Sequence, residues 1–563
     1  MGALMKTKTQ FSLIVAATLL LGLVCYAQKD SFHVLWHDAD MKNIAEPKER
    51  SSGYYEYFFK GQMIEGAKED MNVPRWVRII SGHPKESSNV NALDEVPDSS
   101  WYTNRHRLHR MSAEELMRGP DSGPPPDFSS AVITKAKNSG VTPGMMVKDA
   151  LGETYLIKFD NVNYPNLQSS AEVITTKILY AVGYNVPENY VAYLDPHHLQ
   201  IGEKVEITDS RTGRKRSLTQ DDVDEMLRRV ARTPDGRCRV LASKLLKGKT
   251  KGPFPQVGFR SDDPNDLIPH ENRRELRGFR VISSWINNWD LKEAQSMDMY
   301  VEEGGRKFLR HYLLDFGSSL GADDRPTDYY HGHEYGLDLR SITKELFSLG
   351  IFESANEKTA RIISSEIGNF TSDEFNPGTW KQTYPSPMFD NLTDADAFWA
   401  TRVILSFTEA DLSNIIDTGG YSDPMTKPYM LRTLMERRQM VARYWLGRTD
   451  ALSDFAITNA TEGITLRFHD LMLDHQLTLP QLTTYSYQVK APHYKSSRIT
   501  IDHPEFSIGR DILSAAKENV AADAPIEVNI WTHRQYFTSS PVTVYFDWSP
   551  NREMLTIRKI SRT

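Results

Sequence analysis

A lysine lies inside an apolar strand pattern at Thr154-Tyr155-Leu156-Ile157-Lys158-Phe159. A similar run, Gly144-Met145-Met146-Val147-Lys148, comes before it, and Asp149-Ala150-Leu151-Gly152 between the two runs is typical of a hairpin turn. The pattern predicts two antiparallel strands. Because Lys158 is flanked by Ile157 and Phe159, its charge needs a partner. Asp160, just beyond the strand, is expected at the surface.

A helix is predicted directly after this hairpin, over residues 167–182, where apolar residues recur at helical spacing and Gly183 ends the pattern. Glu172 falls in this helix and can supply the counter-charge that Lys158 needs. Residues 190–194 predict another strand, so the segment from Ala131 onward has the order β-β-α-β.

Charged residues recur in two stretches further along the chain. Asn288-Trp289-Asp290-Leu291-Lys292-Glu293-Ala294-Gln295 comes at the end of a predicted helix that begins at Glu275, and Leu313-Leu314-Asp315-Phe316-Gly317 ends an apolar strand. Lys158, Glu172, Asp290, Gln295 and Asp315 together are the equipment of phosphoryl transfer. A lysine held by a glutamate orients phosphates, one aspartate accepts the proton of the attacking hydroxyl, and an amide and a second aspartate hold divalent metal.

This ordered set resembles the protein-kinase-like superfamily, above all its atypical bacterial branches, such as the HipA-type kinases, and the secretory-pathway kinases. The resemblance covers about residues 131–450 and implies an α+β fold with a bilobed core. Lys158 and Glu172 match the phosphate-binding lysine and its helix partner. Asp290 matches the catalytic-loop aspartate, and Lys292 the lysine that contacts the transferred phosphate. Gln295 and Asp315 match the two metal ligands, so the resemblance implies ATP with Mg²⁺ or Mn²⁺ as cofactors.

The sequence departs from the kinase pattern at four places. No G-x-G-x-x-G run stands over the phosphates, where Asp149-Ala150-Leu151-Gly152 is the only turn found, and Asn288-Trp289-Asp290 replaces His-Arg-Asp. Gln295 stands where asparagine is usual, and no Ala-Pro-Glu follows Asp315-Phe316-Gly317. These losses weaken the label of protein kinase more than that of phosphotransferase.

Two other classes of function stay open on the sequence. Gly317-Ser318-Ser319-Leu320-Gly321 fits the G-x-S-x-G pattern of serine hydrolases, which would make Ser319 a nucleophile, although a helix is not predicted after it. A secreted pseudokinase or binding scaffold is the main alternative, because a signal peptide would take the chain away from the ATP pool of the cytosol. Gln295 and the missing glycine-rich loop also suggest lost catalysis. The retention of Lys158, Glu172, Asp290 and Asp315 favours an enzyme.

Other polar groups near these stretches have structural interpretations. Arg273, Arg274 and Arg277 share a helical face, and salt bridges are the favoured interpretation. The polar residues of 262–271 are best explained as a capped loop, and His311 as structural. Residues 200–251 carry 14 Lys and Arg against 8 Asp and Glu, and they predict a solvated helix and hairpin.

The chain is long enough for several domains. We predict an N-terminal extension at 28–130 that ends near Gly123-Pro124-Pro125-Pro126, a kinase-like N-lobe at 131–195, and a C-lobe at 196–455 that includes the basic insert 200–251. From about residue 456 to 563 the hydrophobic period shifts to two, which predicts a C-terminal all-β domain.

The first 27 residues have the organisation of a secretory signal peptide. Lys6 and Lys8 precede an apolar run at 11–24, and Ala27 precedes the polar Gln28. We expect cleavage after Ala27 and a secreted or periplasmic chain, with membrane anchoring through the N-terminus as the alternative. No later run is long and apolar enough for a membrane span.

Composition narrows the partners. The 563 residues carry 67 Lys and Arg against 74 Asp and Glu, a net charge of −7, which argues against nucleic acid as a partner. Only two cysteines are present, so no disulfide framework is expected. The acceptor of the phosphoryl group is expected to be a hydroxyl of a protein, sugar or lipid.

Overall fold

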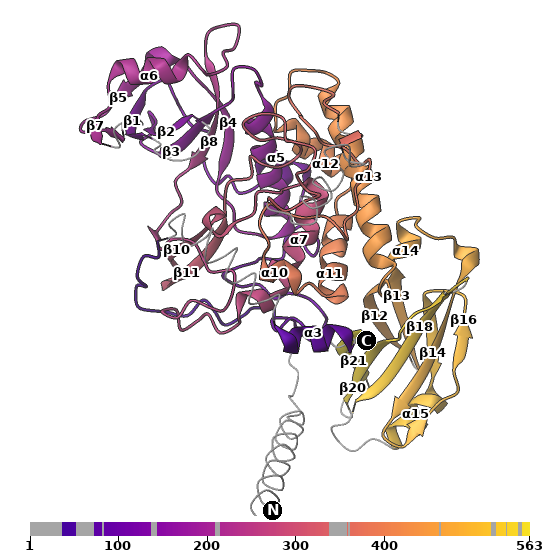
Figure 1. Cartoon of the computed structure of the whole chain (residues 1–563). Helices are drawn as coiled ribbons and strands as arrows, with labels where there is room; N and C mark the ends of the chain where they lie inside the picture. Colours follow the sequence, from indigo (N-terminus) through magenta and orange to yellow (C-terminus); the bar gives the residue numbers. More distant parts are fainter. Residues whose placement is uncertain are drawn as a thin grey trace, which may run out of the picture.

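The computed structural model describes residues 36–51, 72–81, 84–136, 143–208, 214–336, 357–358, 361–460, 463–518, 525–535, 537–549 and 554–562. Helices and sheets are mixed along the chain, which confirms the predicted mixed class (Figure 1). The predicted signal peptide at 1–27 lies outside the described residues. Among the described helices, none combines the length and apolar character that a membrane crossing requires.

A six-stranded sheet carries Lys158. Its strand order is β4-β8-β3-β2-β1-β5, and its strands are β1 (Ala131–Ala136), β2 (Gly144–Lys148), β3 (Thr154–Phe159), β4 (Asn189–Leu194), β5 (Leu199–Ile201) and β8 (Cys238–Lys244). The predicted β2–β3 hairpin is present, with Met146 paired to Leu156. Lys158 on β3 lies opposite Leu241 on β8. The sheet therefore takes a central strand from within the segment that the sequence presents as a basic insert.

The rest of that segment is small and peripheral. It contains the hairpin β6 (Glu206–Thr208) and β7 (Lys215–Ser217), and the helix α6 (Gln220–Leu227). The helix packs Val223 and Leu227 against the apolar residues of the sheet. Its N-terminus has a capping box, with Thr219 and Asp222 as the reciprocal pair.

Helices form the larger core beside and below the sheet (Figure 1). They are α5 (Leu167–Val182), α7 (Arg274–Ile286), α10 (Pro387–Asp390), α11 (Asp394–Leu405), α12 (Glu409–Asp417) and α13 (Thr426–Leu446). Trp285 and Trp399, both almost fully buried, stand in this core. Gly278 on α7 lies so close to Trp399 that a Cβ there would meet its ring at 2.7 Å, so α7 and α11 can pack this tightly only with glycine at that position.

A long hairpin lies beside these helices. It consists of β10 (Ser296–Glu303) and β11 (Arg306–Leu313), joined by Gly304 and Gly305, and the short β9 (Lys249–Thr250) pairs with β10. Both glycines have positive φ, which the tight turn requires. The hairpin connects the loop that carries Asp290 with the segment that carries Asp315.

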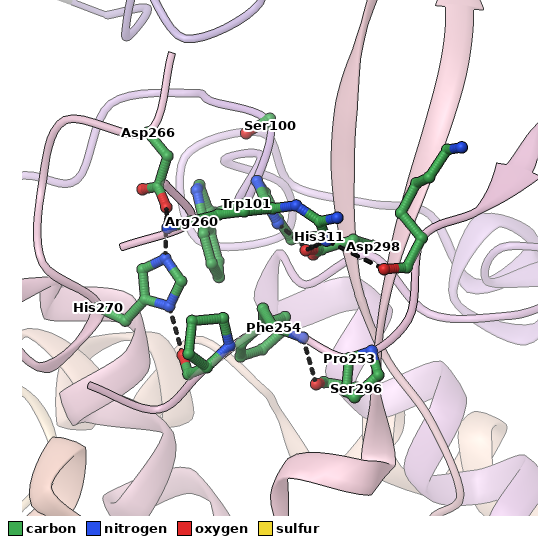
Figure 2. A network of polar contacts seen from close by, with 12 residues as sticks. Ser100, Trp101, Pro253, Phe254, Arg260, Asp266, His270, Ser296, Asp298 and His311 are labelled. Atoms are coloured by element: carbon green, nitrogen blue, oxygen red, sulfur yellow. Dashed lines mark hydrogen bonds and ion pairs between the residues drawn. The ribbon is translucent and has the colours of Figure 1, made fainter. Parts of the chain in front are cut away.

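The N-terminal extension is packed into the body of the protein. Its helices are α3 (Val73–Ile80) and α4 (Ala113–Arg118). Trp101 stacks on His311 with ring centroids 3.6 Å apart and meets Phe254 and His270 edge-on, at 4.9 and 4.6 Å (Figure 2). Phe254 N donates to Ser296 Oγ, directly after Gln295. The extension therefore packs against the β10–β11 hairpin, close to the loop that carries Asp290.

The residues around Trp101 form a buried network of ion pairs (Figure 2). Asp298 accepts from Arg260 at 2.8 Å and contacts His311 at 2.6 Å, while Asp266 contacts His270 at 2.8 Å. All five side chains are at most 5% exposed. Buried charges are tolerated when they are paired in this way, so His311 and the polar residues of 262–271 are structural, as the sequence predicts.

Two further sheets lie at the C-terminal end. One has the order β12-β13-β17, and the other runs β15-β14-β18-β20-β21, with β16 beside β14 and β19 beside β18. The strands are β12 (Leu452–Ala460), β13 (Gly463–Asp470), β14 (Thr483–Ala491), β15 (Tyr494–Lys495), β16 (Ile499–Ile501), β17 (Glu505–Gly509), β18 (Ile526–Arg534), β19 (Phe537–Thr538), β20 (Val542–Ser549) and β21 (Met554–Arg562). Two helices, α14 (Leu471–Asp474) and α15 (Arg510–Glu518), also belong to this region. Leu513 and Ala516 of α15 join the apolar core of these sheets.

Candidate active site

Lys158 lies between two carboxylates. Its Nζ is 3.1 Å from Glu172 Oε2 and 2.6 Å from Asp315 Oδ1. Lys158 is 9% exposed and Glu172 is 2% exposed, whereas 53% of the Asp315 side chain is accessible. Burial opposes the charge of Lys158, but Asp315 and Glu172 outweigh it and raise the pKa of the lysine. The sequence predicts the pairing with Glu172, and the structure adds Asp315 to it.

Asp160 fixes the start of the helix that carries Glu172. It is 3% exposed, so the expectation that it lies at the surface is wrong. Its carboxylate accepts from the backbone N of Ser169 at 2.9 Å and of Asn166 at 3.1 Å. The first N–H groups of a helix have no partner within the helix, and Asp160 satisfies two such donors at the start of α5.

Arg239 on β8 ties the same helix end to the C-terminal helices. Its guanidinium is 5% exposed. It donates to Ser169 Oγ at 3.1 Å and Ser170 Oγ at 2.8 Å on α5, and to the carbonyls of Gly419 and Gly420 after α12. The sheet, α5 and the α12–α13 connection are therefore joined by one side chain. The position of Glu172 is set by contacts on both sides of α5.

Asp290 is held by two neighbours in its own loop. Lys292 Nζ lies 2.9 Å from Asp290 Oδ2, and Gln295 Nε2 donates to the same oxygen at 2.8 Å. Burial opposes the charge of Lys292, and Asp290 outweighs it and raises the pKa of the lysine. The carboxylate of Asp290 is thus oriented, and 18% of the side chain remains exposed to an incoming group.

The orientation of Gln295 differs from that of a metal ligand. Its Oε1 accepts from Lys292 N at 3.3 Å while its Nε2 faces Asp290. Turning the amide over would place its Nε2 against the donor Lys292 N and its oxygen against the carboxylate oxygens of Asp290, and both hydrogen bonds would be lost. Gln295 is therefore arranged to position Asp290 and Lys292. Its predicted role as a metal ligand would require the side chain to leave both contacts.

The segment Asp315-Phe316-Gly317 turns sharply after β11. Asp315 has φ +61°, a left-handed conformation that is uncommon outside glycine. Phe316 is 1% exposed and belongs to the helical core, so it holds the segment in place. A Cβ at Gly317 would lie 2.7 Å from Gln168 Cγ on α5, so a larger residue there would require the Gln168 side chain to move. The turn places the Asp315 carboxylate beside Lys158, while about half of the Asp315 side chain stays exposed.

Backbone hydrogen bonds join the two stretches that carry Asp290 and Asp315. Leu314 N donates to Gln295 O at 2.9 Å, and Trp289 N donates to Ser318 O at 3.3 Å. Asp315 also contributes to the raised pKa of Lys292. The two predicted stretches thus lie side by side, with Lys292 close enough to sense the charge of Asp315.

A polar cavity of about 360 Å³ opens beside Trp289. Asp323, Arg325, Asp328 and Tyr330 are among its lining residues. Burial, followed by the charges of Asp324 and Asp290, raises the pKa of Asp323 to about 6. The sequence gives no sign of this cavity, because the loop that forms it has no periodic pattern.

Divalent metal has one well-placed carboxylate here, Asp315. Within the part of the chain that the structure describes, no group of three or more His, Cys, Asp or Glu side chains is arranged to hold an ion. Magnesium is commonly bound through one or two carboxylates with substrate phosphates as further ligands. The chemistry of Asp315 fits that mode, whereas Gln295 as oriented does not.

Ser319 does not have the surroundings of a hydrolase nucleophile. It is fully buried, donates to Phe316 O at 2.6 Å and lies 2.7 Å from Thr175 Oγ1. Turns and bends follow it where a nucleophile elbow needs a helix. The alternative of a serine hydrolase using Ser319 is therefore wrong, and the serine links α5 to the Asp315 segment.

The three arginines at the start of α7 are engaged in salt bridges. Arg274 and Arg277 both reach Asp396 on α11, at 3.2 and 3.1 Å. Arg273 lies 3.7 Å from Asp266. The structural interpretation of this face is confirmed, and none of the three arginines is available for phosphate.

The strand order adds a turn to the comparison with the kinase pattern. In that pattern the glycine-rich loop precedes the strand pair that ends in the phosphate-binding lysine on the third strand. Lys158 is on β3, and the connection between β1 and β2 contains Gly140. Because the sequence pattern does not predict β1, the turn it offers in that place is Asp149-Ala150-Leu151-Gly152, which joins β2 to β3. Residues 137–142 lie outside the described residues.

Comparisons with known proteins give two solved kinase structures. The Helicobacter pylori proinflammatory kinase CtkA aligns at 12% identity over 57% of this chain and 99% of its own, with a TM-score of 0.31. The Golgi casein kinase with Mn/ADP bound aligns at 9% identity over 52% of this chain and 76% of its own, with a TM-score of 0.22. No family model and no curated protein matches the chain. TM-scores this low carry no argument, so the case for a function lies in the side chains.

Proposed function

We propose that the chain is a kinase-like phosphotransferase that uses ATP and a divalent metal and transfers the γ-phosphoryl group to a hydroxyl acceptor. The observation that carries the proposal is that three charged side chains meet beside Asp290. They are Lys158 on β3, Glu172 on α5 and Asp315 after the end of β11. A buried lysine between two carboxylates is expensive to maintain for structure alone. Perturbed charges at the junction of several elements are typical of functional sites.

The chemistry follows from the positions of these groups. Lys158 would bind phosphate oxygens, with Glu172 keeping it in place when Asp315 turns to the metal. Asp290 would accept the proton of the acceptor hydroxyl. The oxygen of that hydroxyl would form the new bond to phosphorus while the bond from phosphorus to the ADP oxygen breaks. Lys292 would neutralise charge on the transferred group. Bound through Asp315, the metal would supply charge neutralisation between the phosphates.

The acceptor would approach from the polar cavity beside Trp289. Its lining offers carboxylates at Asp323 and Asp328 and a hydroxyl at Tyr330. These groups recognise hydroxyl or cationic acceptors better than anionic ones. A protein, sugar or lipid hydroxyl remains the proposed class, and the reaction is proposed to take place outside the cytosol. N-terminal sequencing of the exported protein tests that location, with Gln28 expected as the first residue.

Metal-dependent nucleotide binding tests the enzyme. We expect Mg²⁺ or Mn²⁺ with ATP to raise the Tm of the wild type, and Lys158→Met and Asp315→Asn to remove most of that shift. Label transfer from γ-labelled ATP should fall by about 10²-fold in both variants, because each removes one electrostatic contact to the reacting group. Lys244→Met, at the last residue of β8 in the same sheet, serves as the matched control and should keep both properties.

A nucleotide-free scaffold is the second candidate. The orientation of Gln295 favours it, because Asp315 is then the one metal ligand that the predicted pair supplies. Absence of any Tm shift with either metal and ATP would establish the scaffold and reject the enzyme. A third outcome is a Tm shift and slow ATP hydrolysis without label transfer to any tested acceptor. That outcome would keep the phosphotransferase chemistry and show that the acceptors tested were the wrong ones.

A further inference from the structure

Helix α3 carries its apolar residues on the outside. Val73, Trp76, Val77 and Ile80 recur at the spacing of one helical face. They are 66%, 47%, 59% and 82% exposed, respectively. Most apolar side chains of this size are buried in a folded domain. Four of them along two turns of one short helix form a continuous exposed stripe.

The attachment of α3 leaves that stripe facing outward. Arg75 Nη2 donates to Asp390 O at 2.7 Å, at the end of α10. The backbone of Asn72 accepts from Trp76 N, and Asn72 Oδ1 accepts from Arg75 N at 3.2 Å, which fixes the first turn. In Figure 1 the helix lies beneath α10 and α11, beside the C-terminal sheets, which extend further down.

A basic pocket adjoins the stripe. It has a volume of about 260 Å³, and its lining includes four cations, Arg75, Arg78, Lys85 and Arg448, against two carboxylates, Asp390 and Asp394. Arg448 is paired with Asp394. Among the described residues, no carboxylate pairs with the side chains of Arg78 or Lys85. Apolar residues and accessible cations therefore lie next to one another on one edge.

We propose that α3 and this pocket bind the surface of an anionic phospholipid membrane. A helix with tryptophan and aliphatic residues on one side and arginines beside them lies in the interface between lipid headgroups and acyl chains. Anionic headgroups would interact with Arg78 and Lys85 while Val77 and Ile80 enter the acyl boundary. The net charge of −7 means that the chain as a whole is repelled by such a surface. Binding would therefore take place at this local edge and would orient the protein.

This inference does not rest on the proposed catalysis. It adds a contact with lipid from a folded helix, independent of whether the predicted signal peptide at 1–27 is removed. The predicted export of the chain would bring α3 to a membrane-bounded compartment.

Vesicle binding tests the proposal with the exported protein. We expect co-sedimentation with phosphatidylcholine vesicles that contain phosphatidylglycerol, and much weaker co-sedimentation with pure phosphatidylcholine or at high salt. Val77→Asp, Ile80→Asp and Arg78→Glu should each weaken binding by roughly tenfold. The matched controls are Leu267→Asp, whose side chain is also exposed at 76%, and Lys495→Glu on β15, and both should bind as the wild type does.

Quenching by brominated lipid gives a readout at residue 76 itself. The wild type should lose tryptophan fluorescence on brominated vesicles, and Trp76→Phe should abolish that loss while keeping co-sedimentation. This measurement decides the question even where residues 1–27 are retained or where a charge substitution unfolds the chain. Equal binding by the α3 variants and the controls, or no quenching through Trp76, would overturn the proposal. A dimer that Val77→Asp dissociates would also overturn it and assign the stripe to a second copy of the chain.

Discussion

At the scale of single residues, variants of Gln295 distinguish two roles for this side chain: positioning Asp290 or binding the metal. Gln295 spans from Asp290 Oδ2 to Lys292 N, and one methylene less would not reach both. We therefore expect Gln295→Asn and Gln295→Ala to lower phosphoryl transfer similarly, by about tenfold, since both release Asp290. The dependence on Mg²⁺ and Mn²⁺ concentration should stay that of the wild type.

Metal titrations provide the contrary outcome for this residue. If Gln295 is a metal ligand, Gln295→Ala should need a higher metal concentration for transfer. Gln295→Asn should then need less metal than Gln295→Ala. That result would return Gln295 to its sequence-predicted role. Gln295→Glu adds a second test, because a second carboxylate would repel that of Asp290 and should lower transfer more than Gln295→Ala does.

Asp323 makes stability depend on pH. Its pKa is raised to about 6 in the folded chain, by burial first and then by Asp324 and Asp290, while an unfolded aspartate titrates near its ordinary value of about 3.9. Between these values the unfolded state loses its proton first, so the contribution of Asp323 to the free energy of unfolding falls as pH rises and is fully unfavourable above pH 6. Asp323→Asn removes this penalty.

The expected result is a Tm difference that grows with pH. Asp323→Asn and the wild type should melt alike near pH 4, and the variant should melt about 1–3 °C higher above pH 7. Differential scanning calorimetry across this range provides the measurement. Asp474→Asn, on an exposed aspartate paired with His469, is the control. A constant Tm difference at all pH values would show that Asp323 is not titrating between 4 and 6.

At the scale of elements, α5 is the helix whose position matters most, and Arg239 is expected to hold it. Arg239→Met would leave the buried Asp160 without its nearby cation, 3.9 Å away, and would free Ser169 and Ser170. Breaking a buried charge contact of this kind costs about 3–5 kcal/mol of stability. Because Glu172 lies on the same helix, metal-ATP binding should weaken as well.

Denaturant unfolding and the nucleotide-induced Tm shift measure the two effects. Arg237→Met is the matched control, since Arg237 precedes β8 and pairs with the exposed Asp235. Arg239→Lys should recover part of the stability but little of the binding, because lysine cannot reach both α5 and the glycine carbonyls. Full nucleotide binding by a stable Arg239→Met would show that α5 keeps its position without this contact.

The sequence predicted the elements with strong periodic patterns and missed those without them. The helix at 167–182 and the strands β2 and β3 are observed at the predicted residues. β1 and β8 were not recognised as members of the sheet, since each lies beside polar, charged segments. Strand pairing is decided by contacts distant in sequence, such as Lys158 with Leu241, which no local pattern contains.

The same division holds for the candidate site. The pair of Lys158 and Glu172 could be predicted because a lysine in an apolar strand needs a nearby carboxylate. The contact of Lys158 with Asp315 spans 157 residues and follows from the fold alone. The role of Gln295 depends on which amide atom faces Asp290, and that is settled by hydrogen bonding in three dimensions. Asp160 was misjudged because its burial comes from the start of α5 folding back over it.

At the scale of the whole molecule, Asp94 joins three parts of the chain. Its carboxylate is 2.5 Å from Arg274 Nη1 on α7 and 2.8 Å from Arg562 Nε on β21. Arg402 on α11 donates to the carbonyl of the same residue at 3.2 Å. Burial opposes ionisation, but Arg274, Arg562 and Arg402 outweigh it and hold the pKa of Asp94 at about 2. A turn of the N-terminal extension therefore links the helical core to the C-terminal sheets.

Asp94→Asn should uncouple the C-terminal sheets from the rest. The substitution leaves Arg274 and Arg562 close together without the negative charge between them, and we expect a loss of about 3–5 kcal/mol from their interface. The last strands should then melt before the helical core, so that calorimetry resolves two transitions where the wild type shows one. Limited proteolysis should cut near residue 450 in the variant first.

The stability of the wild type at low pH provides a second test of the same link, because acid removes the charge of Asp94. Because the folded pKa of Asp94 is depressed, its stabilising contribution is present above the unfolded value of about 3.9 and is lost as pH falls toward 2. The early transition should therefore appear in the wild type on acidification, and Asp94→Asn should show it already at pH 7. The control Asp474→Asn, within the C-terminal region but away from this junction, should melt as the wild type does. One transition in Asp94→Asn at every pH would mean that the remaining contacts, such as Ile560 N with Ala92 O at 2.8 Å, suffice to couple the two regions.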